Sequence, residues 1–327
     1  MANKKSAKSS IFKASKEPEG IAIKGYDFSG GLDMKKFLDA LKSTGFQASH
    51  LGKAIEIARK MRQEKVTIFL GYTSNMATSG VREAILHLVK NKMVHVLVTT
   101  AGGVEEDIIK TLKPFVLGDF RLDGAQLRRR GINRAGNVLI PNDRYIEFEK
   151  IFTPLLGKLL EEQKRTGKIT TPSEICRSLG ELGNETSILY WAAKNNIPVF
   201  CPGITDGSIG DMIFFFKSKP ENAAFKVDVT DDVLKLEDIV LDAKETGAII
   251  LGGSLPKHHI MNANMMREGT KYTIYINTAM EGDGSDSGAL PEEAKSWGKA
   301  AADSSSVKVQ ADATIAFPLL VAGAFVD

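Results

Sequence analysis

Cysteine is scarce in this chain, and a long apolar run is missing. The 327 residues include two cysteines, Cys176 and Cys201, at a spacing that fits no metal-binding motif. Two such thiols suit a reduced, cytoplasmic compartment, where we expect both as buried apolar side chains. No apolar run reaches the roughly 18 residues that a membrane span requires. The N-terminus also lacks the apolar core of a signal peptide.

An excess of charge of either sign is missing as well. The 43 Lys and Arg residues stand against 40 Asp and Glu residues, which leaves a formal net charge of +3. The two signs are interspersed, so the chain has no basic stripe of the kind that follows nucleic acid. We therefore expect a cytoplasmic globular protein that binds neither nucleic acid nor membrane.

The first residues differ in composition from the rest. Lys4, Lys5, Lys8, Lys13 and Lys16 stand among few apolar residues, which is typical of a solvated tail. A transit peptide fits less well, because this stretch contains no arginine. We predict a basic, flexible tail over residues 1–23 and one globular domain over residues 24–327.

Short apolar runs alternate with helical patterns after residue 66. The runs predict buried strands at 66–71, 94–100, 197–201, 248–251, 272–276 and 307–310. Helical patterns are predicted at 81–90, 148–163, 172–179, 185–193, 207–215, 232–244, 256–267, 291–298 and 313–324, with polar loops at 73–80 and around RRRGINRAGN. This alternation predicts an α/β fold, a doubly wound and mostly parallel sheet with helices on both faces, of the Rossmann-like kind.

Polar loops follow five of the predicted strands. Their sequences are TSNMATSG, AGGVEED, PGITDGSIGD, GGSLPKHH and NTAMEGDGSDSG. In a parallel sheet the carboxyl ends of the strands meet at one edge, and ligands bind in the crevice there. We therefore expect these glycines, hydroxyls and carboxylates to lie in one crevice.

Glycines at strand ends suit a diphosphate, because backbone N–H groups and helix N-termini can approach it. The residues placed for that role are Ser74, Asn75, Thr78, Thr100, Ala101 and Gly102. The usual GxGxxG fingerprint is absent, however, and tight turns between strand and helix would explain the same glycines.

Acidic residues also gather in these loops. Glu105, Glu106 and Asp107 are expected in the first turn of a helix, and Asp206, Asp211, Asp283, Asp286 and Glu293 stand in the other loops or just after them. A cage for a small polycation would explain them, and so would independent helix caps. Calcium does not fit the DGSDSG run, because position 12 of such a loop would be Ala294.

Two pairs of side chains share helical faces near the end of the chain. His258 and Asn262 lie one turn apart on a helix for which Ser254 is the predicted N-cap. His258 either is solvated, or it orients a polar substrate or moves a proton. Glu293 and Trp297 form the second pair, and Trp297 either packs in the core or faces an alkylammonium chain.

Lys299 follows Trp297 by two residues. As a nucleophile it would need a neutral amine, reached by desolvation from a reference pKa of roughly 10.4. Most lysines are solvated, and spacing alone does not distinguish the two states.

The chain contains, in order, KGYDFSGG, TGFQASHLGKA, FLGYTSN, LVTTAGGVEED, GINRAGN, PVFCPGITDGSIGDMIFF, ILGGSLPKHHIMNAN, YINTA, GSDSGA, SWGK and ADATIAFPLLVA. Over residues 24–325 these segments resemble the deoxyhypusine synthase family. The resemblance implies an NAD-binding catalytic domain that transfers the aminobutyl group of spermidine. The group would pass as an imine to an enzyme lysine, and then to one lysine of a translation initiation factor precursor, with release of 1,3-diaminopropane.

The resemblance also implies roles for single residues. SWGK makes Lys299 the imine-forming nucleophile, and His258 its partner in proton transfer. The implied NAD-binding residues are Ser74, Asn75, Met76, Ala77, Thr78, Thr100, Ala101, Gly102, Glu106, Asp206, Thr278, Ala279, Asp312 and Ala313. The implied spermidine-binding residues are Glu105, Glu106, Asp211, His258, Asn262, Gly284, Ser285, Asp286, Glu293, Trp297 and Lys299. No metal is implied.

Family members are homotetramers with sites at subunit interfaces, and an N-terminal segment can cover a neighbour's site. The resemblance leaves rival activities open. Homospermidine synthase runs the same half-reaction with putrescine as acceptor. A non-catalytic NAD-binding paralogue and a sirtuin-like deacylase are two further alternatives from other classes.

Overall fold

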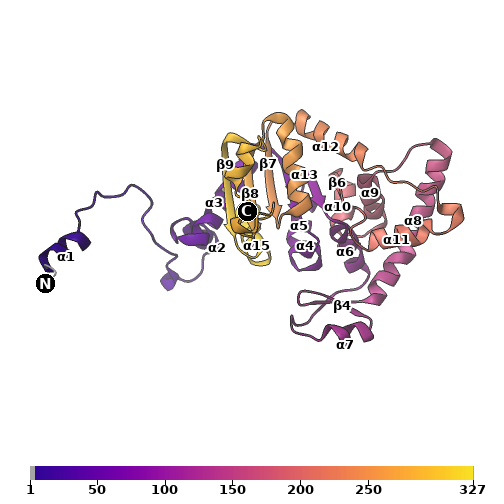
Figure 1. Cartoon of the computed structure of the whole chain (residues 1–327), viewed down its shortest axis with the longest axis horizontal. Coiled ribbons are helices and arrows are strands. Elements are labelled where there is room, and N and C mark those ends of the chain that lie inside the picture. The colour runs from indigo at the N-terminus through magenta and orange to yellow at the C-terminus, as the bar shows by residue number, and fades with distance from the viewer. Residues whose placement is uncertain (1–3, 327) are drawn as a thin grey trace.

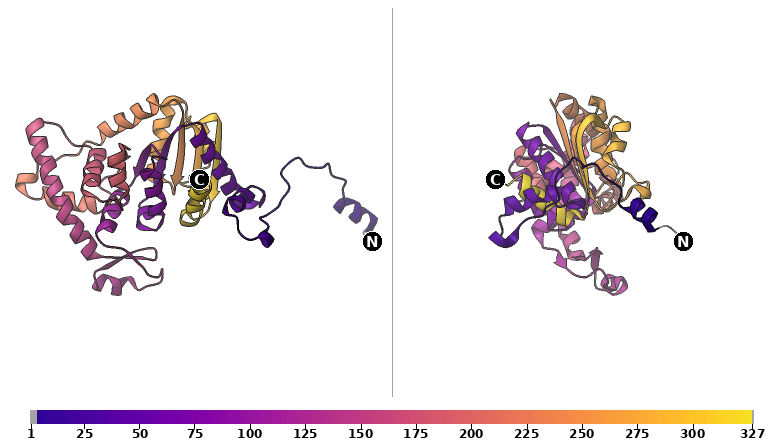
Figure 2. Two further views of the ribbon diagram at one scale, coloured as in Figure 1. Left: turned by 180° about the vertical axis from the view of Figure 1, so that it is seen from behind. Right: turned by 90° about the vertical axis from the view of Figure 1, so that its left-hand side faces the viewer.

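The computed structural model describes residues 4–326, and a six-stranded sheet forms its centre (Figures 1 and 2). Its strands are β1 (Thr67–Tyr72), β2 (Val96–Thr99), β6 (Val199–Phe200), β7 (Thr246–Leu251), β8 (Thr270–Asn277) and β9 (Ala300–Gln310). They lie in the order β6-β2-β1-β7-β8-β9, and every neighbouring pair is parallel. The predicted α/β fold with a mostly parallel sheet is confirmed.

Helices precede, connect and follow the strands of this sheet. They are α1 (Lys4–Ile11), α2 (Met34–Ala40), α3 (Phe46–Gln63), α4 (Asn75–Thr78), α5 (Val81–Lys90), α6 (Ala101–Leu112), α7 (Gly124–Arg129), α8 (Asn142–Thr166), α9 (Pro172–Leu182), α10 (Ile188–Asn195), α11 (Ser208–Lys217), α12 (Thr230–Asp242), α13 (Ser254–Asn264), α14 (Pro291–Ser296) and α15 (Ala313–Ala324). Short 3-10 turns lie at Phe28–Gly30, Leu41–Ser43, Pro220–Asn222, Met265–Arg267 and Glu281–Asp283. No helix in residues 4–326 is long and apolar enough to cross a membrane.

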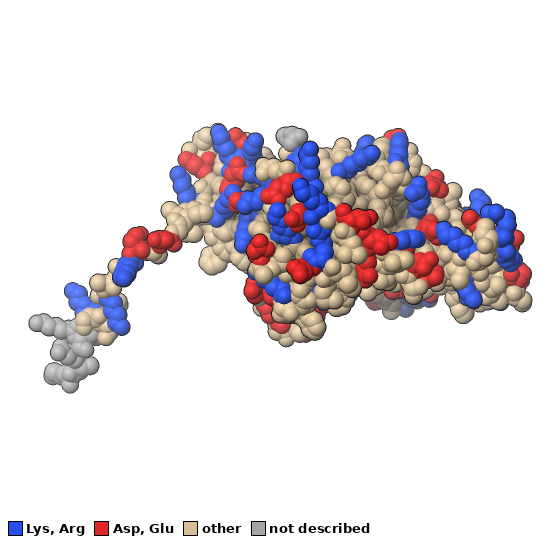
Figure 3. Space-filling model, turned by 90° about the horizontal axis from the view of Figure 1, so that it is seen from above, with Lys and Arg blue, Asp and Glu red and all other residues tan. Residues whose placement is uncertain are grey.

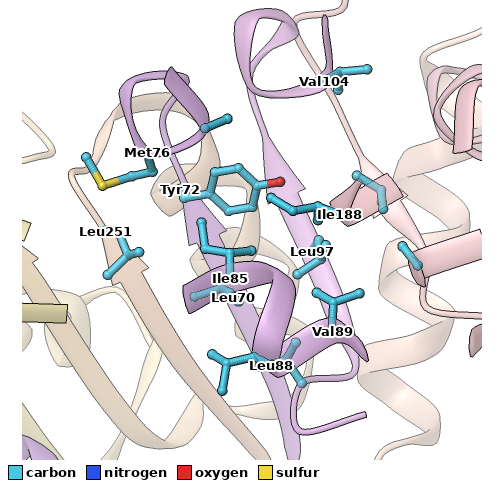
Figure 4. Close-up of a cluster of buried hydrophobic side chains, with 14 of the residues drawn as sticks. Leu70, Tyr72, Met76, Ile85, Leu88, Val89, Leu97, Val104, Ile188 and Leu251 are labelled. Atoms are coloured by element: carbon cyan, nitrogen blue, oxygen red, sulfur yellow. The ribbon is translucent and has the colours of Figure 1, made fainter. Parts of the chain in front are cut away.

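The sheet buries both of its faces, because successive side chains of a strand point to opposite sides. Leu70 and Tyr72 of β1 pack against Ile85 and Leu88 of α5 on one face (Figure 4). Phe69, which directly precedes Leu70, belongs to the core on the other face. Residues of α3, α5, α9, α10 and α15 cover the first face, and residues of α12, α13 and α14 cover the second. Both cysteines are buried and unpaired, as predicted.

The direction of winding changes between β1 and β7. From β1 the chain adds β2 and then β6 on one side, whereas β7, β8 and β9 extend the sheet on the other side. Such a switch point separates the loops that leave the two central strands, and ligands of parallel sheets bind there.

Three local predictions were wrong. Residues 73–80 are not all loop, because α4 forms one turn within them. The RRRGINRAGN segment is not a plain loop: β4 (Ile132–Ala135) and β5 (Val138–Pro141) pair as a hairpin, and β3 (Val116–Leu117) adds to it. Ser254 is not the N-cap of α13, because Gly253 holds that position and Ser254 is the first helical residue.

The last strand is longer than its apolar run suggested. β9 begins at Ala300, while the prediction covered only 307–310. It is an edge strand whose first half is partly exposed, so its residues there are small and polar and carry no buried apolar pattern.

The predicted tail lies away from the sheet. α1 is exposed and is joined to the body by an extended stretch of exposed residues that ends near Lys24 (Figure 1). Lys24 N donates to Ser43 O at 2.9 Å, where the chain meets the body. Flexibility of this segment remains a prediction. On the body, lysines and arginines are interspersed with acids on the face seen in Figure 3.

Candidate functional site

A cavity of about 410 Å³ opens at the carboxyl ends of β7, β8 and β9, and we call it the edge cavity. Its walls come from α4, the β4–β5 hairpin, the segment after β8 and the start of α15. Six residues that were expected to bind NAD line it: Asn75, Met76, Thr78, Thr278, Asp312 and Ala313.

The other expected NAD-binding residues lie beside or behind this cavity. Ser74 N donates to Thr100 Oγ1 at 3.1 Å, and Ala101 N donates to Asp206 Oδ1 at 2.9 Å. A Cβ at Gly102 would lie 2.7 Å from the Ser74 Cβ, so no side chain fits there. The remaining members, Ala77, Glu106 and Ala279, are not among the lining residues.

The edge cavity fits a dinucleotide. The N-terminus of α15 lines it, and the Asp312 carboxylate caps this helix by accepting from Thr314 N at 2.8 Å. Gly252 on the cavity wall has a φ of +84°, which other residues adopt only with strain, and a Cβ there would meet Thr73. Thr78, Thr278 and Asn75 add hydroxyl and amide groups for polar contacts.

A second cavity, of about 200 Å³, lies between α13, α14 and β8, and we call it the lysine cavity. Five residues that were expected to bind spermidine line it: His258, Asp286, Glu293, Trp297 and Lys299. Its apolar walls include Met261 and Leu290. A narrow, partly apolar cavity with two carboxylates suits an alkyl chain that ends in ammonium groups.

The end of α14 directs Lys299 into this cavity. Pro291 occupies the first position of α14, where its missing N–H is not needed. Gly298 then adopts a φ of +70°, and Lys299 N donates to Ala294 O at 2.9 Å, which closes the helix. The Lys299 Nζ lies 5.4 Å from the centre of the Trp297 ring.

Lys299 does not enter from the predicted crevice. Its carbonyl oxygen accepts from Thr270 N at 3.1 Å, at the amino end of β8. The backbone of Lys299 therefore lies at the edge of the sheet opposite to the polar loops, although Lys299 lines the lysine cavity. The reason is that Lys299 precedes its strand, β9, whereas the polar loops follow theirs.

Asp286 carries an unused acceptor. Its Oδ1 lies 3.5 Å from His258 Nδ1, and its Oδ2 is buried without a hydrogen-bond partner. The hydroxyl of Tyr275 is buried and unpartnered in the same way. Buried polar atoms of folded proteins are nearly always hydrogen-bonded, so these two point to a polar or cationic ligand.

Lys257 is a cavity residue that sequence reasoning missed. It is buried, and its Nζ donates to the carbonyl oxygens of Asp286 and Ala289 while lying 4.3 Å from the centre of the Tyr275 ring. Burial lowers the pKa of Lys257, and the Asp286 carboxylate opposes this shift. A lysine in the first turn of a helix carries no sequence signal of burial.

Two of the expected ligand acids cap helices. Glu105 accepts from Ser208 N at 3.1 Å and from Ile209 N at 2.8 Å, at the start of α11. Asp206 accepts from Ala101 N at the start of α6. Glu105, which follows β2, thus caps α11, and Asp206, which follows β6, caps α6. For these two residues, helix capping explains the carboxylates without a ligand.

The run from Glu105 to Asp107 lies in the second turn of α6, not the first, because the helix begins at Ala101. All three acids are buried. Burial raises the pKa of Glu106 to about 7, although the Thr78 hydroxyl donates to its carboxylate. Asp107 pairs with Arg82 at 2.7 Å and accepts from Ser187 at the start of α10, which makes it a structural residue.

Besides Glu105 and Glu106, four further expected spermidine-binding residues line neither cavity. Asp211 is exposed on α11, Asn262 is half-buried on α13, and Gly284 and Ser285 are exposed in the loop before Asp286. Residues 4–326 also contain no group of His, Cys, Asp and Glu side chains that could hold a metal ion.

Known proteins resemble this chain over nearly its whole length. The family model described as deoxyhypusine synthase matches residues 36–324. A protein of Methanocaldococcus jannaschii named "Probable deoxyhypusine synthase" is 52% identical over 325 residues, covering 95% of this chain and 98% of that protein. Homospermidine synthase 2 of Senecio vernalis is 50% identical over 347 residues, covering 98% and 94%.

A solved structure agrees with these sequence relatives. The crystal structure of a protein of Entamoeba histolytica, assigned as a deoxyhypusine synthase, superposes with a TM-score of 0.69 at 33% identity. The match covers 93% of this chain and 96% of that one.

Proposed function

Since the chain belongs to the deoxyhypusine synthase family, we propose that it is an NAD-dependent aminobutyltransferase of that activity. It transfers the 4-aminobutyl group of spermidine, through an imine on Lys299, to a lysine of the precursor of the hypusine-containing translation factor. 1,3-Diaminopropane is released.

The lysine cavity carries this proposal. It brings an amine nucleophile, Lys299, together with the carboxylates of Asp286 and Glu293 and the ring of Trp297. The buried, unpartnered Oδ2 of Asp286 offers an acceptor for an ammonium group of the substrate. The Trp297 ring stacks against the alkyl chain or its charge.

Residues such as Asn75, Thr278 and Asp312 would hold NAD in the edge cavity, where it would supply a hydride acceptor for the carbon beside the secondary amine of spermidine and a hydride donor afterwards. No net redox change results. Gly252, where a side chain would be strained and would meet Thr73, would leave room for the backbone to approach the diphosphate.

Lys299 acts on the imine that remains after this oxidation. Its neutral Nζ attacks the imine carbon, the bond from that carbon to the propylamine nitrogen breaks, and the electron pair leaves with 1,3-diaminopropane. His258, beside Asp286, moves the proton from the attacking amine to the leaving amine. The acceptor lysine then displaces Nζ by the same exchange.

Homospermidine synthase is the second candidate, because a homospermidine synthase is 50% identical to this chain. That activity uses the same lysine imine but passes the aminobutyl group to putrescine. Offering the purified enzyme each acceptor separately distinguishes the two: transfer to putrescine and never to the precursor protein would favour this candidate. Release of nicotinamide would instead indicate a deacylase.

We further infer a cytoplasmic homotetramer with sites at subunit interfaces. Two observations support shared sites. The exposed Asp211 stands on α11 beyond β6, whereas Lys299 stands before β9. The exposed α1 at the end of a long connection is also free to reach a neighbouring subunit, as the family resemblance implies.

The test is to trap the imine. The enzyme is incubated with NAD and spermidine labelled in its aminobutyl part, reduced with borohydride and digested, and the labelled residue is mapped. We expect label on Lys299 and none in Lys299→Ala, while Lys295→Ala, a matched lysine one turn away that pairs with Glu292, keeps it. Label at another residue, or persisting in Lys299→Ala, would contradict the mechanism.

A further inference from the structure

One loop connects the two cavities. Residues 278–290, which we call the bridging loop, run from the end of β8 to the start of α14. At its first residue, Thr278 lines the edge cavity. Near its end, Asp286 and Ala289 line the lysine cavity. The placement of this loop therefore sets how the two cavities lie relative to each other.

Lys308 of β9 holds both ends of the bridging loop. Its Nζ donates to Ala279 O at 2.7 Å and to Gly288 O at 2.6 Å. The lysine is 7% exposed, and in the described part of the chain no carboxylate lies within ion-pair distance of it. Burying an ammonium group that has only carbonyl partners costs desolvation free energy. We therefore asked which function these two contacts serve.

Other contacts join only one end of the loop to the body. Lys257 binds the carbonyl oxygens of Asp286 and Ala289, and Ser254 N donates to Ser287 Oγ at 3.0 Å. Both contacts come from α13 and act on the second half of the loop. Lys308 spans the first and second halves, which neither of the others does.

We propose that Lys308 is a positioning residue for the reaction at Lys299, holding the bridging loop so that the two cavities stay in register. This role rests on the proposed function. Lys308 does not line the lysine cavity and touches no reacting atom there. It acts through the loop backbone, and thereby through the orientation of Asp286 towards His258.

The test compares Lys308→Met with Lys53→Met. Both lysines border the same outer pocket beside β9, but Lys53 is exposed on α3. In Lys308→Met we expect faster hydrogen exchange of amides 279–289. We also expect the KM for spermidine to rise about tenfold and kcat to fall about tenfold, because small displacements of positioned groups cost up to about 100-fold in rate. The KM for NAD changes less, since other elements form most of the edge cavity. Lys53→Met should match the wild type throughout.

Lys308→Arg provides a second variant, should Lys308→Met fail to fold. It keeps the charge, but its planar fork cannot reach both carbonyls equally, so we expect a smaller shift in the same direction. The proposal would be overturned if hydrogen exchange of the loop amides in Lys308→Met matched the wild type. Faster exchange with unchanged kcat and KM would overturn it as well. Absence of spermidine cleavage in the wild type would instead reject the proposed function, and loop exchange would still decide whether Lys308 tethers the loop.

Discussion

Glu106 is a carboxyl group kept in an unfavourable place. It is 8% exposed, and burial raises its pKa to about 7, well above the ordinary pKa of a glutamate. The folded protein thus holds a proton that the unfolded chain releases at lower pH. Stability is greatest below the unfolded pKa and falls as the pH rises towards the folded pKa.

Replacing Glu106 by Gln removes this dependence. We expect Glu106→Gln to become more stable than the wild type by up to about 3 kcal/mol between about pH 5 and about pH 8. Urea unfolding at the two pH values, without added dinucleotide, measures the difference. Glu83→Gln is the control, because its carboxylate is 60% exposed. If the unfolding free energies of Glu106→Gln and the wild type changed in parallel with pH, the pKa of Glu106 would not be raised in the folded state.

For single residues, the sequence indicated which side chains could bind a ligand, but not what each of them contacts in the fold. The acids of the segment AGGVEED lie in α6, which follows the carboxyl end of β2. Whether each acid faces water, a ligand or a helix end depends on contacts with α11 and α10, about 100 residues later in the chain. No local pattern encodes such contacts, and for the same reason Lys257 and Lys308 were missed as buried lysines.

The end of α14 shows how one glycine sets the direction of the Lys299 side chain. Gly298 follows the helix at a φ of +70°, and a Cβ there would meet only Met265 at 3.9 Å. A side chain at this position is therefore strained by its backbone and not by its neighbours.

We expect Gly298→Ala to lower the unfolding free energy by roughly 1–2 kcal/mol, the cost of a left-handed conformation. The borohydride-trapped label on Lys299 should fall with it, because relaxation of residue 298 turns Lys299 away. Gly157→Ala in the interior of α8, where nothing lies within 4 Å, should instead be neutral or stabilising. A loss of stability in Gly298→Ala with full labelling would mean that other contacts aim the lysine.

Element boundaries were predicted well wherever apolar periodicity was strong. The observed α5 and α15 match the predicted ranges, and the buried strands were all found. The misses were short or half-exposed elements: α4, the β4–β5 hairpin and the first half of β9. Such elements bury one face at most, so their sequences need no regular apolar pattern.

The whole chain separates two groups of expected spermidine-binding residues. Asp211 follows β6, and Tyr275 of the lysine cavity lies on β8, with β2, β1 and β7 between these strands. At about 4.8 Å per strand this amounts to roughly 19 Å across the sheet. A cavity of about 200 Å³ does not span that distance, so a second subunit is the candidate source of Asp211.

Subunit mixing tests this arrangement. We expect Lys299→Ala and Asp211→Ala each to lack spermidine cleavage. Co-expressed and purified as mixed assemblies, they should recover about one quarter of the wild-type activity, because random pairing leaves one intact site in half of the pairs. Mixed assemblies without activity would mean that each site draws both residues from one chain.

The pairing of β1 with β7 also has a consequence for synthesis on the ribosome. Phe69 pairs with Ala248, so one edge of β1 stays unpaired until β7 has been synthesised. Until residues 246–251 emerge, an apolar strand presents unpaired backbone groups to other nascent chains. Chains that end before Thr246 are therefore prone to aggregate, and chaperone supply matters most while the second half is being translated.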